Sequence, residues 1–257
     1  MGLADLNVHS IHSYDGTVTI PAILKHVANN IKLNVIALTD HDQTCGVEEA
    51  VQLAPAYGIE VIPGCEVSTA EGHLLTLFVD RSVQSGLSYL NTTLRTGEIG
   101  GLCIAPHPTA PFFSSVSFLT IQRVLQNPDA AWILVSIEAY NGGLVLTHRN
   151  AYITAIWQSF DMAQVGNSDA HVLRTIGQGA TCFKGKTAAD LKQALIKRET
   201  QIQQEHSMNG FEVLWTYLFQ HLLLKIGWAR WNAGPKAPVI YRWVGQISRY
   251  EQTAQIS

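Results

Sequence analysis

The chain contains few cysteines, and none of them lies close to another. Cys45, Cys65, Cys103 and Cys182 are the only four in 257 residues, and no pair forms a C-x-x-C motif. Zinc knuckles and dithiol redox sites need closely spaced cysteines, so this spacing excludes both. We expect reduced, buried thiols, because free cysteine is among the most buried residue types.

Charged residues are also scarce, and neither sign dominates. Lys, Arg, Asp and Glu make up 14% of the chain and the formal net charge is −3, whereas about a quarter of an average globular protein is charged. No global positive field is available to bind duplex nucleic acid through counterion release, so we exclude that partner. A short oligonucleotide held by local contacts is still compatible with this charge.

The N-terminus lacks the basic segment and apolar run of a secretory signal peptide. Internal repeats and low-complexity segments are also absent. We therefore expect a cytoplasmic protein. Its hydrophobic fraction of 47% is enough, at this chain length, to build a sizeable core.

Short β-branched apolar runs alternate with longer helical patterns up to about residue 200. The predicted strands are Leu3–His9, Val35–Thr39, Glu60–Ile62, Leu74–Val79, Gly101–Ala105, Leu134–Glu138 and Ala163–Asn167. The predicted helices are Pro21–Asn29, Val47–Tyr57, Ile121–Leu125, Leu144–Phe160 and Ala188–Lys197. This alternation indicates successive βα units and a largely parallel sheet or barrel.

The composition changes near residue 200, which divides the chain into a domain of residues 1–200 and an extension of residues 201–257 rich in tryptophan and leucine. Polar and charged residues interrupt the stretch Phe211–Trp231 too often for a transmembrane helix. We favour a helix packed on the barrel or in a dimer interface. The alternative is an interfacial helix that contacts a membrane surface.

Acids and histidines gather at or just beyond the ends of the predicted strands. The clusters are Asp5, His9, His12 and Asp15; Asp40, His41 and Asp42; Glu66; His73; His107; and Asp169 with His171. In a barrel of βα units the carboxyl ends of the strands lie on one face, so these side chains are expected to converge there. Zn, Mn and Fe accept imidazole and carboxylate ligands in proteins, and the pattern therefore predicts a metal site on that face.

The individual residues of these clusters receive different interpretations. We interpret the four histidines that follow strands as metal ligands, namely His9, His41, His107 and His171. We interpret His26, His148, His206 and His221 as ordinary surface or core histidines, because they fall on predicted helices or in the extension.

Three further cluster residues have outer or undecided roles. Asp5 is expected to orient a ligand imidazole from outside the metal shell. Asp42 is expected to cap a helix or to form a turn. For His12 the sequence is compatible both with a metal ligand and with a residue that takes no part in the site.

Several segments together resemble the motifs of the PHP superfamily of metal-dependent phosphoesterases, named for polymerase and histidinol phosphatase members. In chain order they are DLNVHSIHSYDG, ALTDHDQTCGVEEA, PGCEVS, APHP, GNSDAH and IGQGATCF. The resemblance covers residues 3 to about 197. It implies an α/β fold, a distorted (β/α)7 barrel, with two or three divalent ions (Zn, Mn, Fe or Mg) at the carboxyl ends of the strands.

The resemblance also implies a role for each matched ligand position. His9 and Asp169 would hold a first metal, and Glu66 would bridge it to a second. His73 and His107 would complete the second site. The third metal would be held by Asp15, His41 and His171.

Asn7 is a departure from the family pattern, which usually has a histidine ligand of the first metal at this position. We keep Asn7 as a candidate ligand, although an amide oxygen is a weaker donor than imidazole for Zn or Mn. Three accounts are open. The site binds a harder ion such as Mg²⁺ through oxygen ligands, His12 replaces the missing imidazole, or the first metal is lost and activity is impaired.

The implied reaction is hydrolysis of a small phosphorylated substrate by a metal-activated hydroxide. Candidate substrates are a nucleotide 3′,5′-bisphosphate, a short oligonucleotide or a phosphomonoester. Glu66, His41 and His171 are candidate catalytic residues, and Arg174 is the candidate for a phosphate contact. The third motif reads HPTAP and lacks the arginine that members often carry there. The alternative function is a catalytically impaired module with a binding or regulatory role. Either function is compatible with a homo-oligomer.

The access route to the site is expected to be open. Only about forty residues separate Glu66 from His107, which leaves no room for a separate lid domain. The stretch Thr109–Phe118 is expected to be a loop whose aromatic residues line a pocket.

Overall fold

The computed structural model describes residues 1–110, 114–143 and 148–204, together with residues 212, 214–216, 218, 219 and 222. Its strands are β1 (Gly2–Val8), β2 (Val35–Leu38), β3 (Glu60–Thr69), β4 (Gly72–Leu77), β5 (Leu102–Ala105), β6 (Leu134–Asn141), β7 (Ala163–Asn167), β8 (Gly179–Phe183) and β9 (Thr200–Gln204). Its α-helices are α1 (Ile20–Asn30), α2 (Val47–Leu53), α3 (Tyr89–Glu98), α4 (Phe118–Leu125), α5 (Pro128–Ile133), α6 (His148–Trp157) and α7 (Ala188–Lys197). Short 3₁₀ helices are η1 (Ala54–Tyr57) and η2 (Leu173–Thr175).

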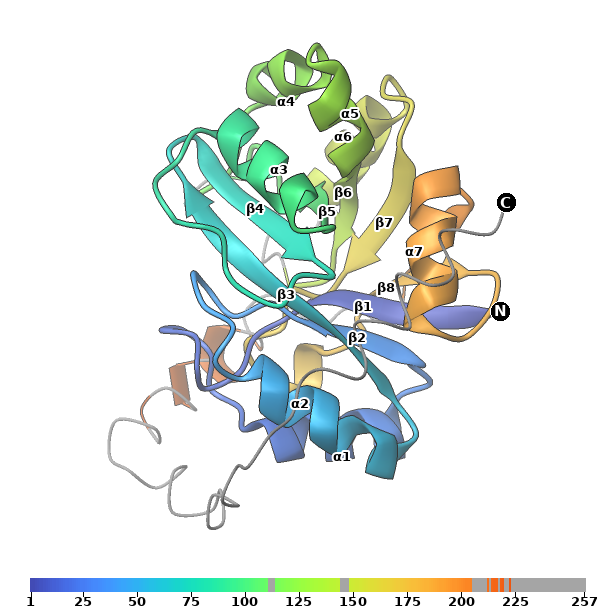
Figure 1. Ribbon diagram of the computed structural model, residues 1–257. Coiled ribbons are helices and arrows are strands. Elements are labelled where there is room, and N and C mark those ends of the chain that lie inside the picture. Colours follow the sequence, from blue (N-terminus) through green and yellow to red (C-terminus); the bar gives the residue numbers. More distant parts are fainter. Residues whose placement is uncertain are drawn as a thin grey trace.

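The nine described strands form one sheet in the order β7-β6-β5-β4-β3-β2-β1-β8-β9. The sheet curls until β7 meets β1 and the β8–β9 pair (Figure 1). The Leu6 N–H donates to the Asn167 side-chain oxygen at 3.1 Å, and the His9 N–H donates to the Ala170 carbonyl at 2.9 Å. The predicted barrel is therefore confirmed, with nine strands in the described residues instead of seven.

The sheet is less parallel than the sequence pattern suggested. The pairs β1–β2, β2–β3, β5–β6 and β6–β7 are parallel, whereas β3–β4, β4–β5, β1–β8 and β8–β9 are antiparallel. The predicted strand Glu60–Ile62 is the first part of a longer strand, β3, which forms a hairpin with β4. Glu66 consequently lies inside a strand, which corrects the expectation that it follows the end of one, and His73 lies near the start of β4, directly before the predicted strand Leu74–Val79.

Alternate residues of the strands point into the barrel and fill it, as the two-residue period of a strand requires. The interior layer includes Ala4, Leu6, Val35, Ala37, Ile62, Leu75, Leu77, Ile104, Val165 and Phe183, all fully or almost fully buried. Helix α7 closes one end of this core with Leu191 and Leu195. The Ala188 N–H at the start of α7 donates to the carboxylate of Glu60 at 2.7 Å. Because Glu60 begins β3, α7 covers the end opposite to the carboxyl ends of the parallel strands.

The outer faces of the strands are covered by two groups of helices. Helices α1 and α2 pack on β1 and β2, and α3, α4 and α5 pack on β4, β5 and β6 (Figure 1). The predicted helix Val47–Tyr57 changes to the 3₁₀ helix η1 after Leu53, where Pro55 removes an N–H donor.

Helix α3 was not predicted from the sequence. Its buried residues are Tyr89 and three threonines, so few strongly apolar residues mark it in the sequence. The hydroxyls of Thr92, Thr93 and Thr96 donate to the carbonyls of Ser88, Tyr89 and Thr92, four residues earlier in each case. These bonds satisfy the buried hydroxyls and let a polar sequence pack against the sheet.

Part of the extension is described, and it shows an exposed apolar stripe. Leu214, Trp215, Leu218, Phe219 and Leu222 recur at helical spacing and are 46–66% exposed. These five side chains face solvent, and packing of the extension on the barrel stays a prediction. Contact with a second copy or with a membrane surface stays a prediction, as does the domain boundary at residue 200. Among the described residues, no helix has the length and hydropathy needed to span a membrane.

The expectation for the cysteines holds in part. All four are free, with Cys65 and Cys103 buried. Cys45 is exposed and Cys182 only partly buried, so the prediction of burial is wrong for Cys45.

Asp5 anchors the loop after β7 to β1. Its buried carboxylate accepts hydrogen bonds from the backbone N–H groups of Ser168 at 3.0 Å and Gly177 at 2.8 Å, and from the Ser168 hydroxyl. Burial raises the pKa of Asp5 to about 6, and the bonds from Ser168 and Gly177 oppose this rise. The predicted role of Asp5 is therefore corrected, because its carboxylate binds this loop and not a ligand imidazole.

We predict that Asp5→Ala lowers the free energy of unfolding by about 3 kcal/mol, because buried N–H and O–H donors lose their acceptor. Urea denaturation of the full chain measures this change. The matched control is Asp80→Ala, which removes a partly exposed carboxylate and is expected to change stability by no more than about 0.5 kcal/mol. Equal effects of the two substitutions would contradict the anchoring role.

Candidate metal centre

The predicted ligands come together at one end of the barrel, from six segments of the chain. His9 follows β1, Asp15 lies in the loop after it, His41 follows β2, Glu66 lies within β3, His73 is near the start of β4, His107 follows β5, and Asp169 and His171 follow β7. The antiparallel direction of β4 brings its first residues to the carboxyl ends of the parallel strands. The predicted convergence of the cluster is confirmed.

Glu66 lies at the middle of the cluster and faces three imidazoles. Its Oε1 atom is 3.0 Å from His73 Nδ1 and 3.0 Å from His107 Nε2, and its Oε2 atom is 3.1 Å from His9 Nε2. His9 Nε2 also lies 3.5 Å from Asp169 Oδ1. A carboxylate whose two oxygens face different ligand groups has the geometry of a bridging ligand.

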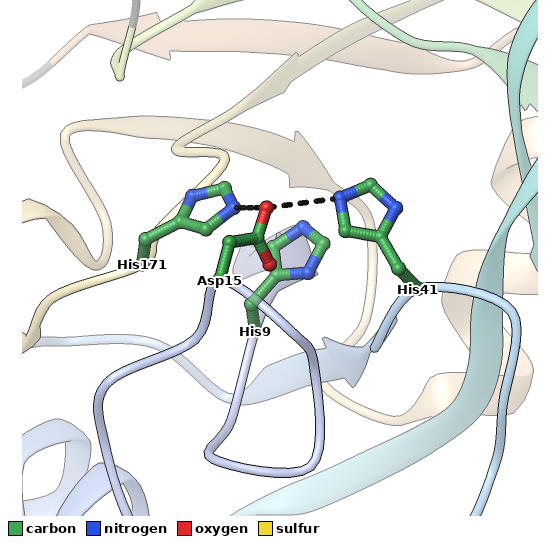
Figure 2. A group of neighbouring side chains, drawn as sticks. All are labelled: His9, Asp15, His41 and His171. Atoms are coloured by element: carbon green, nitrogen blue, oxygen red, sulfur yellow. Dashed lines mark ion pairs between the residues drawn. The ribbon is translucent and has the colours of Figure 1, made fainter. Parts of the chain in front are cut away.

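A second group surrounds Asp15, nearer to solvent. Its Oδ2 atom is 3.3 Å from His41 Nε2 and 3.1 Å from His171 Nε2, so that Asp15 lies between the two rings (Figure 2). The ring of His9 stacks on that of His171 with centroids 4.2 Å apart. His9 therefore joins this group to the one around Glu66.

The donor atoms fit divalent metal ions. Three sets have all their ligand atoms within 4.8 Å of one another: His9, Asp15, His41 and His171; His41, Glu66 and His73; and His9, Glu66 and Asp169. Despite these short contacts, several of the buried atoms have no partner with the geometry of a hydrogen bond, among them both ring nitrogens of His9, Nδ1 of His73 and Oε2 of Glu66. Buried polar atoms are costly without a partner, and imidazole nitrogen and carboxylate oxygen are ligands of Zn, Mn and Fe.

The electrostatics keep the two central carboxylates ionised. Burial raises the pKa of Glu66, but the contacts with His107, His73 and His9 outweigh it and hold the pKa well below its usual range. Burial also raises the pKa of Asp15, and the bonds from His171 and His41 again outweigh it. Both groups are therefore anionic at neutral pH, as ligands of a cation must be.

Outer contacts orient two of the imidazoles. His171 Nδ1 lies 2.9 Å from the backbone carbonyl oxygen of Asp169, and His107 Nδ1 lies 3.2 Å from the Ser115 hydroxyl. Each contact leaves Nε2 directed at a carboxylate, as in metal sites where the second ring nitrogen is held by a carbonyl or hydroxyl group.

A buried network that sequence reasoning missed supports the centre. Oε2 of Glu138 accepts from the backbone N–H of His107 at 2.6 Å and from the Asn141 amide at 2.9 Å, and Oε1 accepts from the Asn167 amide at 3.0 Å. Asn141 also donates to Asp169 Oδ2 at 3.2 Å. Burial raises the pKa of Glu138 to about 7, and the charge of Asp169 adds to the rise. The available signal was an acid at the end of the predicted strand Leu134–Glu138.

The same network holds two residues in a costly backbone conformation. His107 has a φ of 28° and Asp169 a φ of 52°, both in the left-handed region. Such conformations cost about 1–3 kcal/mol each and persist where surrounding contacts determine them. Glu138 and Asn141 supply these contacts, so strain is concentrated at the centre.

Asn7 makes contacts that differ from those expected of a ligand. Its side chain is fully buried, and its Oδ1 atom accepts from the Thr39 hydroxyl at 2.7 Å. Its Nδ2 atom donates to Asp169 Oδ1 at 3.3 Å. Thr39 Oγ1 also accepts a hydrogen bond from the Val8 N–H at 3.1 Å, so the hydroxyl proton of Thr39 is available to donate to Asn7. In this arrangement Asn7 orients Asp169, and its oxygen points to Thr39 instead of to the cluster.

Other residues singled out in the sequence lie outside the three sets. His12 Nε2 is 4.0 Å from Glu49 Oε2, which favours the bystander interpretation. Asp42 forms a turn, with a φ of 56° and its Oδ1 atom accepting from the Ser68 N–H at 2.7 Å. It does not cap α2, whose N-cap residue is Gly46.

The remaining predicted positions are placed as follows. Arg174 is exposed on η2, and its phosphate contact stays a prediction. His26 lies on α1. His206, His221 and the side chain of His148 lie outside the described residues, as do Phe112 and Phe113 of the aromatic stretch. Phe118, taken as the end of that loop, begins α4 after the N-cap Ser117.

Residues 5–218 match the family model of the PHP domain. The chain belongs to the PHP domain family. It is 28% identical over 220 residues to the 5′-3′ exoribonuclease of Haemophilus influenzae, which covers 82% of this chain and 67% of that protein. It is 32% identical over 106 residues to the phosphoribosyl 1,2-cyclic phosphate 1,2-diphosphodiesterase of Eggerthella lenta, covering 39% and 40% of the two chains.

A solved structure from Bifidobacterium adolescentis, assigned as a metal-dependent phosphoesterase, has the same fold. It superposes with a TM-score of 0.59 at 15% identity, over 76% of this chain and 96% of that one. The predicted family, its barrel and its class of hydrolytic enzyme are confirmed. The ligand role of each residue and the identity and number of the ions stay predictions.

We predict that Glu66→Gln lowers the number of Mn²⁺ ions retained per chain, because the amide has neither the charge nor the second ligand oxygen of the carboxylate. Mass spectrometry of the metal content after loading and gel filtration measures this number. Glu49→Gln, at a carboxylate 44% exposed, is the matched control and should retain the wild-type metal content. Full retention by Glu66→Gln would show that Glu66 is not a ligand.

We also predict that Glu138→Gln weakens Mn²⁺ binding by about 10–100-fold, the effect typical of lost outer contacts in metal sites. In this variant the NH₂ group of the glutamine faces the N–H groups that donate to the carboxylate in the wild type. Titration calorimetry measures the affinity, and Glu98→Gln, at an exposed carboxylate paired with Arg95, should bind like the wild type. An unchanged affinity in Glu138→Gln would refute a positioning role.

Proposed function

We propose that this PHP-family enzyme hydrolyses a phosphoester bond of a small phosphorylated substrate. The candidate substrates are a nucleotide 3′,5′-bisphosphate, the 5′ end of a short oligonucleotide and a phosphomonoester. The observation that carries the proposal is the convergence of histidines and carboxylates around Glu66 and Asp15. The relatives named as an exoribonuclease and a phosphodiesterase support the same class of reaction.

The cluster provides the requirements of this chemistry. Bound divalent ions would lower the pKa of a coordinated water and neutralise charge on the phosphate oxygens. Glu66 and Asp169 would hold such ions from inside the barrel, where both side chains are nearly or fully shielded from solvent. The orientation that Asn141 and Asn7 give Asp169 keeps its carboxylate directed at His9.

The outer residues are those that can contact the substrate. The side chain of His171 is 21% exposed, whereas that of His41 is 4% exposed. If it does not hold a metal ion, His171 Nε2 is therefore the better placed of the two to donate a proton to the leaving oxygen. Arg174 lies three residues farther along, on η2, and would bind a second phosphate group of the substrate.

The segment between Glu66 and His107 agrees with the sequence expectation that it leaves no room for a separate lid domain. All residues between Glu66 and His107 are described, and they form the end of β3, β4, α3, β5 and their connections. No lid is built from this segment. A small substrate or the end of a nucleic-acid strand would meet Asp15 and His171 first, because their side chains are 17% and 21% exposed.

The alternative function is a catalytically impaired PHP module with a binding or regulatory role. Asn7 motivates it, because its oxygen is committed to Thr39 and not to the cluster. Under this alternative the set of His9, Glu66 and Asp169 binds its ion weakly.

One experiment separates the two functions. The Mn²⁺-loaded enzyme is assayed with adenosine 3′,5′-bisphosphate and with p-nitrophenyl phosphate, next to Asn7→His and Glu66→Gln. We expect turnover by the wild type and its loss in Glu66→Gln, because that change removes the central carboxylate. Activity that appears only in Asn7→His would establish the impaired module instead, and a Glu66→Gln variant as active as the wild type would refute the centre.

A further inference from the structure

An exposed aromatic ring lies directly beside the metal centre. Tyr14 is 71% exposed, although its neighbour Asp15 belongs to the cluster. Its ring stacks on the imidazole of His41, with centroids 4.7 Å apart and an interplanar angle of 19°. One face of the tyrosine thus covers a predicted ligand. Its large exposure leaves the rest of the ring accessible from solvent.

The loop that carries Tyr14 is held in place by hydrogen bonds within the loop and to Asp40, the residue before His41. The backbone N–H and the hydroxyl of Ser10 donate to the buried carboxylate of Asp40 at 2.6 and 2.8 Å. The Ser13 hydroxyl donates to Asp15 Oδ1 at 2.6 Å. Gly16 packs so closely that a Cβ atom there would lie 1.8 Å from the Ser10 carbonyl oxygen. The ring of Tyr14 is therefore positioned before any ligand binds, which lowers the entropy cost of using it.

Such a ring suits one chemical group in particular. Bases of single-stranded nucleic acids and nucleotides stack on exposed aromatic side chains, and this stacking is tolerant of base identity. The segment between Glu66 and His107 forms no lid that would provide another surface for a base. A ligand phosphate near Asp15 and His171 would leave the nucleoside beside the neighbouring residue, Tyr14.

We propose that Tyr14 forms a nucleobase-binding subsite, in which the base, the Tyr14 ring and the His41 imidazole make a continuous stack. The substrate class is then phosphoesters of nucleotides and short oligonucleotides, as opposed to phosphate esters without an aromatic group. This inference rests on the proposed function for the location of the phosphate. Stacking of the base on Tyr14 contributes to ligand affinity, so it can be tested by binding measurements without any turnover.

The first test is equilibrium binding to the full-length, Mn²⁺-loaded chain, measured by calorimetry. The probes are a non-hydrolysable adenosine 5′-phosphonate and methylphosphonate, which has no base. We expect the adenosine probe to bind at least about 10-fold more tightly than methylphosphonate, the gain of one base–aromatic stack. Tyr14→Ala should lose this gain, and Tyr14→Phe should keep it because the ring is retained. Methylphosphonate should bind all three proteins alike.

Two binding results would overturn the subsite. One is equal affinity of the adenosine probe for the wild type and Tyr14→Ala, including the case in which it binds neither. The other is equal weakening of both probes by Tyr14→Ala, which would mean that the substitution disturbs the centre and not a base contact. An unchanged metal content of Tyr14→Ala supports the specific interpretation.

Kinetics separate the subsite from the proposed function. With adenosine 3′,5′-bisphosphate, Tyr14→Ala should raise KM about 10-fold with little change in kcat, while KM for glycerol phosphate stays the same. If the wild type hydrolyses no phosphoester but binds the adenosine probe through Tyr14, the proposed function fails and the subsite stands. If turnover is normal and Tyr14→Ala leaves both KM values unchanged, the subsite fails and the function stands.

Discussion

The structure depends on one buried carboxylate that is surrounded by imidazoles. Glu66 is 1% exposed and lies within about one hydrogen-bond length of His9, His73 and His107. A buried charge is tolerated only where opposite charges or ligands compensate it. The hairpin of β3 and β4 meets this requirement, because it places Glu66 and His73 on adjacent strands and points both into the end of the barrel. The remaining ligands arrive from loops that follow neighbouring strands.

Around this carboxylate the chain is organised in layers of decreasing burial. Glu138 and Asn141 form the deepest layer and position His107 and Asp169 through buried hydrogen bonds. The strained backbone at those two residues is the cost of directing their side chains at the centre. Asp15, His171 and Tyr14 form the outer layer, where a substrate can arrive. Helix α7 closes the opposite end of the barrel, so the helix-packed end of the core and the end that carries the candidate metal centre are separate.

Much of this arrangement could be predicted because its signals are local. Strands β1, β2 and β7 are short buried segments with polar residues at or just after their ends, and the predicted segments contain β2 and β7 fully and all of β1 except Gly2. Strand β9 was missed because TQIQQ contains a single apolar residue and forms a strand through pairing with β8. The antiparallel direction of β4 was also out of reach, since an apolar run has the same period in either direction.

The sequence alone determined which residue types can bind a metal and that most of them follow a strand, because both depend on side-chain chemistry and on short-range pattern. Only the tertiary structure decided which atoms face one another. The amide oxygen of Asn7 is directed by Thr39, 32 positions away, and the carboxylate of Glu138 by the backbone of His107, 31 positions away. Such hydrogen bonds leave no periodic trace in the chain, because they exist only after the barrel has closed and excluded water from both partners.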